Sequence, residues 1–155
     1  MAIIEFARNV LKLQKASSSE LNTKCVPVVG LIHEWKKDGK IIKGTNKELG
    51  GTMRLGSYPA ELLNNSLIRN IYKSKIITER HRHRYEVNTN YKDQFEKKGL
   101  LFSGNSPDKS LPEIVELKNH PWFIGVQFHP EFKSRPLAPH PLFSSFIKAA
   151  KNHKK

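Results

Sequence analysis

The stretch Trp122-Phe123-Ile124-Gly125-Val126-Gln127-Phe128-His129-Pro130-Glu131-Phe132 joins an apolar run to a histidine and a glutamate two residues apart. The run predicts a buried strand, and Pro130 stiffens the chain where the strand ends. Residues two apart in an extended segment point to the same side, so we expect His129 and Glu131 to face each other. A carboxylate placed there can hold one imidazole nitrogen and leave the other to take a proton from a thiol or hydroxyl. The stretch therefore indicates the base half of a catalytic triad.

The nucleophile of such a triad is not evident in the sequence. Its single cysteine, Cys25, lies in Asn22-Thr23-Lys24-Cys25-Val26-Pro27. That context has no glycine-flanked tight turn to present the sulfur atom and no helix beginning behind it to activate the thiol. A histidine and a glutamate near a strand end also occur together in many surface loops, so the pair alone does not decide the function.

Two other segments accompany the first stretch, namely Leu49-Gly50-Gly51-Thr52-Met53-Arg54-Leu55-Gly56 and Glu79-Arg80-His81-Arg82-His83-Arg84-Tyr85-Glu86-Val87-Asn88. Together with residues 126–132, and in this order, they resemble the glutaminase part of the CTP synthase family. His140-Pro141-Leu142-Phe143, followed by Ile147-Lys148-Ala149-Ala150, resembles the end of the same enzymes. The resemblance therefore runs from the first residue nearly to the last.

The resemblance implies an α/β fold of the class I glutamine amidotransferase type, with an incomplete doubly wound, mostly parallel sheet whose first half is missing. In this family a Gly-x-Cys-Leu-Gly-x-Gln turn carries the nucleophilic cysteine, and the helix that follows it resembles residues 1–10. We therefore expect residues 1–155 to be the C-terminal portion of a glutamine amidotransferase domain. In this interpretation the chain is a fragment that lacks the nucleophile turn, the linker and the amidoligase domain.

The resemblance also assigns the site residues. His129 and Glu131 would be the catalytic base and the carboxylate that orients it, while Glu20 and Arg84 would bind glutamine. A carboxylate suits the α-ammonium of a free amino acid, and a guanidinium can bind its α-carboxylate through two hydrogen bonds. We expect no metal and no cofactor in this segment. The resemblance implies ATP and Mg only for the absent amidoligase domain.

The implied activity is the synthesis of CTP from UTP, ATP and glutamine, with L-glutamine as the partner of this segment. UTP and ATP would bind only through the absent domain, and the full-length enzyme would be a homo-oligomer. The isolated chain is predicted to be inactive because the nucleophilic cysteine is absent. Two alternatives stay open at this point: a non-catalytic remnant that binds glutamine or synthase subunits, and a basic nucleic-acid-binding module.

The composition of the chain bears on its possible partners and on its location in the cell. A net charge of +13 and a pI near 9.9 favour acidic partners in general. The lysines are scattered, however, and the sequence has neither a zinc-ligand spacing nor an aromatic RNA-binding strand, so we expect no specific nucleic acid. No apolar run approaches the roughly 20 residues that span a bilayer, which predicts no membrane partner. The lone cysteine and the lack of a signal peptide pattern predict a cytoplasmic location.

Periodicity and turn residues predict a single compact unit with mixed elements. Helices are expected at residues 1–13, 62–72, 91–98 and 141–151, the third of them ended by Gly99. Strands are expected at residues 26–32, 49–55, 74–87, 100–103, 113–117 and 122–128, with the last as the most buried. In the final helix one apolar face is predicted, made of Leu142, Phe143, Phe146, Ile147 and Ala150.

Overall fold

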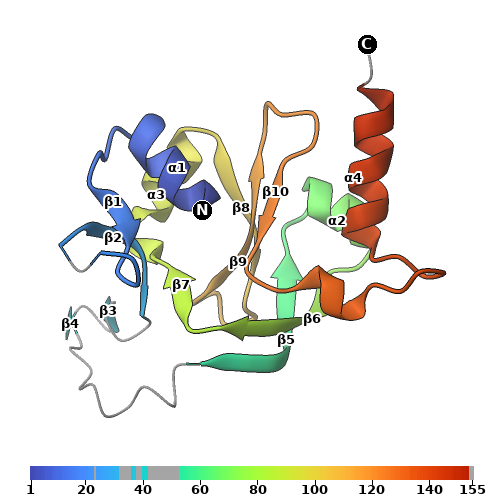
Figure 1. Cartoon of the computed structure of the whole chain (residues 1–155), viewed down its shortest axis with the longest axis horizontal. Helices are drawn as coiled ribbons and strands as arrows, with labels where there is room; N and C mark the ends of the chain where they lie inside the picture. The colour runs from blue at the N-terminus through green and yellow to red at the C-terminus, as the bar shows by residue number, and fades with distance from the viewer. Residues whose placement is uncertain (23, 32–35, 38–39, 42–52, 154–155) are drawn as a thin grey trace. The chain divides into compact units, whose positions relative to one another are not determined.

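The computed structural model describes residues 1–22, 24–31, 36–37, 40–41 and 53–153 (Figure 1). Contacts group the chain into two compact units. Unit 1 comprises Met1–Arg54 and His83–Lys98, and unit 2 comprises Leu55–Arg82 and Gly99–Lys155. The sequence predicts one unit, whereas the chain passes from one unit to the other at three points, so neither unit is continuous in sequence.

Unit 1 contains a three-stranded sheet in the order β1-β2-β7 (Figure 1). Its strands are β1 (Ala16–Ser18), β2 (Val26–Leu31) and β7 (Tyr85–Val87). Helix α1 (Ala2–Asn9) packs against β1 and β2. It buries Ile3, Ile4 and Ala7, whose spacing puts them on one helical face.

A second helix follows the sheet of unit 1. The 3-10 turn η3 (Thr89–Tyr91) leads into α3 (Lys92–Lys97), and its fully buried Phe95 lies with its ring centroid 5.8 Å from that of Phe6. Gly99 follows α3 with a φ of +94°, the left-handed conformation that ends helices and that glycine adopts without strain. The short strands β3 (Lys36–Lys37) and β4 (Lys40–Ile41) pair in the antiparallel direction.

Unit 2 contains a five-stranded sheet in the order β10-β9-β8-β5-β6 (Figure 1). The strands are β5 (Arg54–Leu62), β6 (Ile76–His83), β8 (Leu100–Asn105), β9 (Pro112–Leu117) and β10 (Ile124–Val126). The 3-10 turn η4 (Pro130–Lys133) and two helices, α2 (Leu67–Tyr72) and α4 (Pro141–Asn152), complete the unit. Helix α2 packs against α4.

The α/β class is confirmed, but the strand directions differ from the expected mostly parallel sheet. Among the described strands, β1 and β2 pair in parallel. The pairs β2–β7, β5–β8, β8–β9 and β9–β10 are antiparallel. The reason is local for β8 and β9, because the short turn between them is closed by a 2.8 Å hydrogen bond from the Ser106 N–H to the Leu111 carbonyl. So short a connection can only join antiparallel neighbours.

One apolar cluster forms the core of unit 2. Its buried members are Ala60, Leu62, Ile68, Ile77, Ile114, Phe128 and Leu142. They come from the sheet, from both helices and from the segment before His129, so the core fixes where that segment leaves the sheet. Burial of each large side chain contributes about 1.5–3 kcal/mol. Gly104 allows β8 to approach β9 closely, since a Cβ there would lie 2.7 Å from Ile114 Cδ1.

Several predicted boundaries shift. Helix α1 ends at Asn9 rather than Leu13, because the Leu11 N–H turns back to the Phe6 carbonyl and Lys12 has a φ of +61°. Residue Leu62 belongs to β5, so the helix predicted from there begins only at Leu67. The extended segment 74–87 is confirmed as β6 and β7. The strand predicted at residues 49–55 lies mostly outside the described residues.

The burial of the last two predicted elements is also corrected. Strand β10 is shorter than residues 122–128 and only half-buried, because it lies at the edge of the sheet with a single neighbour. On α4 only Leu142 is buried, while Phe143, Phe146 and Ile147 are 40%, 49% and 65% exposed. Across the described residues, none of the helices has the length and apolar character needed to cross a bilayer.

Candidate active site

His129 and Glu131 contact each other directly in unit 2. His129 Nδ1 lies 2.7 Å from Glu131 Oε1. The backbone that achieves this is not the extended segment that the spacing predicts, since Glu131 lies in the 3-10 turn η4 with His129 at its N-terminal boundary. The pair therefore meets across a tight turn, which Pro130 begins with a φ suited to its first position.

Two contacts besides that with Glu131 hold His129 in place. Its backbone N–H donates to the Arg80 carbonyl on β6 at 2.8 Å. The ring stacks on Phe132, with centroids 5.0 Å apart and an interplanar angle of 21°. The side chain is 36% exposed, so a substrate can reach it. Because Nδ1 is engaged by Glu131, Nε2 is the ring nitrogen that this contact leaves available for proton transfer.

The charge of Glu131 suits this contact. Desolvation raises the pKa of Glu131, but the hydrogen bond from His129, the backbone N–H of Glu131 and the His129 charge together outweigh it. The pKa of Glu131 is therefore held below its ordinary value of 4.5, and the side chain is a carboxylate near neutral pH. A carboxylate that accepts the Nδ1 proton leaves Nε2 with a lone pair, which is the form of histidine that acts as a base.

Glu20 and Arg84 both belong to unit 1. Glu20 is exposed and follows β1, where its N–H donates to Ser18 Oγ at 3.2 Å, and half-buried Arg84 forms the bend before β7. In the registers, Ser18 pairs with Val29 and Tyr85 pairs with Leu31. Both residues therefore lie at the same end of the sheet, on strands two spacings or about 10 Å apart. Two long side chains can converge on a small zwitterion over that distance.

A buried charge cluster supports the bend at Arg84. Glu86 is fully buried, and its Oε1 lies 3.5 Å from Arg54 Nη1 and 3.5 Å from His83 Nδ1. The same His83 nitrogen lies 3.1 Å from the Tyr85 carbonyl oxygen. These contacts close the backbone on both sides of Arg84. Sequence reasoning missed Arg54 and Glu86, although the short spacing of His83 and Glu86 is a visible signal.

Cys25 lies in a bend immediately before β2 and is a free, half-buried thiol. The element that follows it is a strand, so its sulfur has no helix N-terminus behind it. Nothing in its local structure makes it resemble an activated nucleophile. Cys25 is in unit 1, and His129 is in unit 2.

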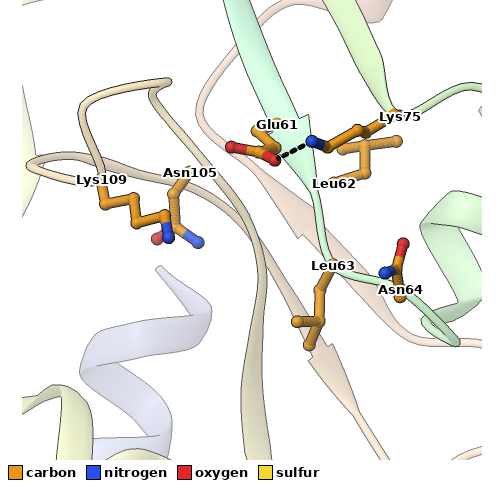
Figure 2. Close-up of a pocket in the computed structure, with 7 residues that line it drawn as sticks. All are labelled: Glu61, Leu62, Leu63, Asn64, Lys75, Asn105 and Lys109. Carbon is orange, nitrogen blue, oxygen red and sulfur yellow. Dashed lines mark ion pairs between the residues drawn. The ribbon is translucent and has the colours of Figure 1, made fainter.

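A surface hollow in unit 2 contains none of the predicted site residues. Figure 2 shows its lining, in which Lys75 Nζ and Glu61 Oε1 form a 3.0 Å ion pair. The Lys75 side chain is 64% exposed, so solvent screens the pair.

The comparisons with known proteins fit this arrangement. The model of the family "Glutamine amidotransferase class-I" matches residues 1–149. The chain belongs to the class I glutamine amidotransferase family. The α/β fold with its glutaminase-type sheet is the fold of that family.

Within the family, the chain is similar to CTP synthases. It is 77% identical over 154 residues to the CTP synthase of Pelagibacter ubique (strain HTCC1062), covering 99% of this chain and 29% of that relative. It is 60% identical over 151 residues to the CTP synthase of Rhodospirillum rubrum, covering 97% of this chain and 28% of that relative. The chain thus spans less than a third of the length of these curated relatives.

A solved structure identifies the matching part. The glutaminase domain of Trypanosoma brucei CTPS with bound acivicin superimposes with a TM-score of 0.82 and 37% identity, covering 99% of this chain and 57% of that chain. The chain therefore corresponds to the glutaminase part of CTP synthases. These comparisons favour neither of the two alternative functions.

Proposed function

We propose that these residues supply the base, the carboxylate that orients it and part of the glutamine site in the glutaminase domain of a CTP synthase. The observation that carries the proposal is the 2.7 Å contact between His129 Nδ1 and Glu131 Oε1, in a chain that aligns with such domains. The complete enzyme is proposed to work in the cytoplasm as a homo-oligomer. Its ATP, Mg and UTP are proposed to bind outside these residues.

The first half of the proposed reaction forms a thioester. A cysteine from a segment outside these 155 residues loses its thiol proton to His129 Nε2, and the thiolate attacks the side-chain amide carbon of glutamine. His129 then gives the proton to the departing nitrogen, so ammonia leaves and a glutamyl thioester is left. Glu131 stabilises the imidazolium that exists between these two proton transfers.

The second half regenerates the enzyme. Water attacks the thioester carbon with His129 as base, and the cysteine leaves as a thiol after taking the proton back. The products are glutamate and ammonia. In the complete synthase, the ammonia replaces the 4-oxygen of UTP at the expense of ATP.

Glutamine recognition is proposed for unit 1. Glu20 pairs with the α-ammonium of glutamine, and Arg84 binds its α-carboxylate through two hydrogen bonds. Their placement at one end of the three-stranded sheet supports this assignment. Neither residue takes part in proton transfer.

The test uses a hybrid enzyme, in which the part of the Pelagibacter ubique CTP synthase that lies outside the matched segment is joined to these 155 residues. CTP formation is measured with glutamine and, separately, with ammonium chloride. His129→Ala should abolish the glutamine-dependent activity and leave the ammonia-dependent activity nearly intact, since the base serves only the release of ammonia. His153→Ala, on the exposed C-terminal end of α4, is the matched control and should change neither activity.

The two activities of the His129→Ala variant distinguish a role in the reaction from damage to the fold. Undiminished glutamine-dependent activity in His129→Ala would remove this residue from the reaction. Loss of both activities would mean that the substitution damages the fold or the transfer of ammonia, and the assignment of His129 as a base would lose its support.

A further inference from the structure

Strand β6 holds the turn that carries Glu131 at several points. The His129 N–H donates to the Arg80 carbonyl at 2.8 Å, which holds the start of the turn. At its end, Lys133 Nζ donates to the Thr78 carbonyl at 2.6 Å and lies 3.4 Å from Glu79 Oε1. Lys133 is the last residue of η4, two positions after Glu131. The carboxylate of the dyad therefore lies between two attachments to the same strand.

Glu79 is a buried acceptor for several donors. Its side chain is 1% exposed, and its Oε1 accepts the Tyr72 hydroxyl at 2.9 Å. His140 Nε2 lies 3.1 Å from the same oxygen. The His140 Nδ1 accepts the Leu142 N–H at 3.3 Å at the start of α4, so Nε2 is the ring nitrogen that donates to Glu79.

A buried carboxylate needs a cation, and Lys133 provides it. Burial raises the pKa of Glu79, but the hydrogen bonds from His140 and Tyr72 and the charges of His140 and Lys133 outweigh it, so the pKa of Glu79 is lowered. The carboxylate is thus charged near neutral pH. Among the described residues, Lys133 is the lysine that forms an ion pair with it. An unpaired charge at this depth would be strongly unfavourable.

The segment from Ser134 to His140, which follows η4, is also held beside Glu79. The His140 N–H donates to Ser134 Oγ at 3.1 Å, so the residue after η4 is held beside the residue that begins α4. The neighbouring polar groups thus belong to α2, β6, η4 and α4. The turn has no free end on either side of Glu131.

We infer that Lys133 is a positioning residue of the His129–Glu131 dyad: its ion pair with Glu79 holds the end of the turn on β6 and so keeps the Glu131 carboxylate at hydrogen-bonding distance from His129 Nδ1. The inference rests on the proposed function of the dyad. It concerns Lys133, a residue that the sequence analysis does not assign to the site.

The exposed fractions of the Lys133 and Glu79 side chains indicate how much the loss of their ion pair should lower the rate. The Lys133 side chain is 43% exposed while that of Glu79 is 1% exposed, so solvent weakens the pair without abolishing it. Loss of the pair should displace Glu131 rather than unfold the turn, because the His129–Arg80 backbone bond remains. Small displacements of a group that orients a base cost about tenfold to a hundredfold in rate. The partial exposure favours the lower end of that range.

The experiment compares Lys133→Met, Lys133→Arg and Arg135→Met in the hybrid enzyme. Arg135 is exposed and lies in the same segment, whereas the ion pair with Glu79 is formed by Lys133, so the Arg135 variant is the matched control for loss of one positive charge. Lys133→Met should lower the glutamine-dependent kcat about tenfold, with a KM for glutamine changed less than about twofold. Lys133→Arg should restore most of the rate. Arg135→Met should match the unchanged enzyme, and the ammonia-dependent rate should stay constant in all three variants.

The kcat values of the Lys133 and Arg135 variants decide whether Lys133 positions the dyad. A Lys133→Met variant with unchanged glutamine-dependent kcat overturns the inference, while His129→Ala in the same assay reports separately on the proposed function. Equal losses in Lys133→Met and Lys133→Arg, or an equal loss in Arg135→Met, also overturn it. As a second measurement, Lys133→Met introduced into a Glu79→Gln background should lower the glutamine-dependent kcat by a smaller factor than it does in the unchanged hybrid enzyme, because the ion pair is already lost.

Discussion

Oε1 of Glu116 accepts the backbone N–H of Ile68 at 2.9 Å, although the two residues are 48 positions apart in sequence. Oε2 of the same carboxylate accepts the Leu67 N–H at 3.0 Å, and Ser66 Oγ accepts the Arg69 N–H. A strand residue thus satisfies two of the backbone donors that the first turn of a helix leaves unpaired. The negative charge also lies at the positive end of the helix dipole.

Glu116→Gln should therefore destabilise the start of α2. The amide retains one acceptor oxygen but loses the charge and the second acceptor, which costs about 1–2 kcal/mol. The measurement is hydrogen exchange of the α2 amides in the hybrid enzyme, which should become faster. Glu61→Gln is the control, because its ion pair with Lys75 is solvent-exposed (Figure 2), and it should leave those amides unchanged.

Arg84→Ala should raise the KM of the hybrid enzyme for glutamine. A lost bidentate contact to a carboxylate is worth about 2–5 kcal/mol, so the increase should exceed tenfold. Ammonia-dependent activity, measured in parallel, should be unaffected. Arg82→Ala is the matched control, because this exposed arginine lies two residues earlier on β6. An unchanged KM in Arg84→Ala would exclude Arg84 from the glutamine site.

The Glu79 carboxylate should make the free energy of unfolding depend on pH in the acidic range. The pKa of Glu79 is lowered from 4.5 in the folded protein, so its contribution is complete above pH 4.5 and is lost as the pH falls through the folded pKa. Tyr72, His140 and Lys133 face this carboxylate. At pH 7 the Glu79→Gln variant of the hybrid enzyme should have a lower Tm than the unchanged enzyme, and the difference should shrink as the pH falls below 4.5. A difference that stays constant with pH would contradict this.

The 155 residues by themselves should release no ammonia from glutamine. Cys25 precedes a strand and lacks the environment that activates a thiol, so His129 has no nucleophile to serve within them. The assay is ammonia release at high protein concentration. Turnover that disappears in Cys25→Ser would instead make Cys25 the nucleophile.

The isolated chain should also associate or remain loosely packed. The α4 face that contains Phe143, Phe146 and Ile147 is largely exposed, and such apolar surface promotes association. The free energy of unfolding of a domain is only about 5–15 kcal/mol, so an apolar face without a packing partner can lower it by a large fraction. Sedimentation at several protein concentrations, combined with a urea titration, tests this. A monomer with one sharp, concentration-independent transition would show a self-sufficient domain.

Local patterns were enough to predict part of the fold. Strand β2 follows the apolar run that begins at Val26, and α4 begins at Pro141, whose fixed φ suits the first turn of a helix. Strand order and burial were not predictable in this way. The run predicted to form the most buried strand became β10 at the edge of the sheet, since hydropathy does not encode which strand pairs with which.

The contact between His129 and Glu131 could be predicted from sequence, because residues only two positions apart are held close together by the backbone. The 3-10 turn that joins His129 to Glu131 could not, as it depends on contacts with β6 that arise from distant residues. Lys133 and Glu79 were missed for the same reason. Their 3.4 Å contact joins segments more than fifty positions apart, for which periodicity carries no signal.

The alternation along β6 makes errors of strand register unfavourable during folding. Ile77, Glu79 and His81 point to the interior, whereas Thr78, Arg80 and Arg82 are exposed. A slip by one residue would bury two guanidinium groups without partners and expose Glu79 and His81, at a cost of several kcal/mol for each buried charge. It would also move the Arg80 carbonyl away from the N–H of His129. A misaligned strand would therefore be disfavoured, and the turn that carries Glu131 could not attach to it in the same way.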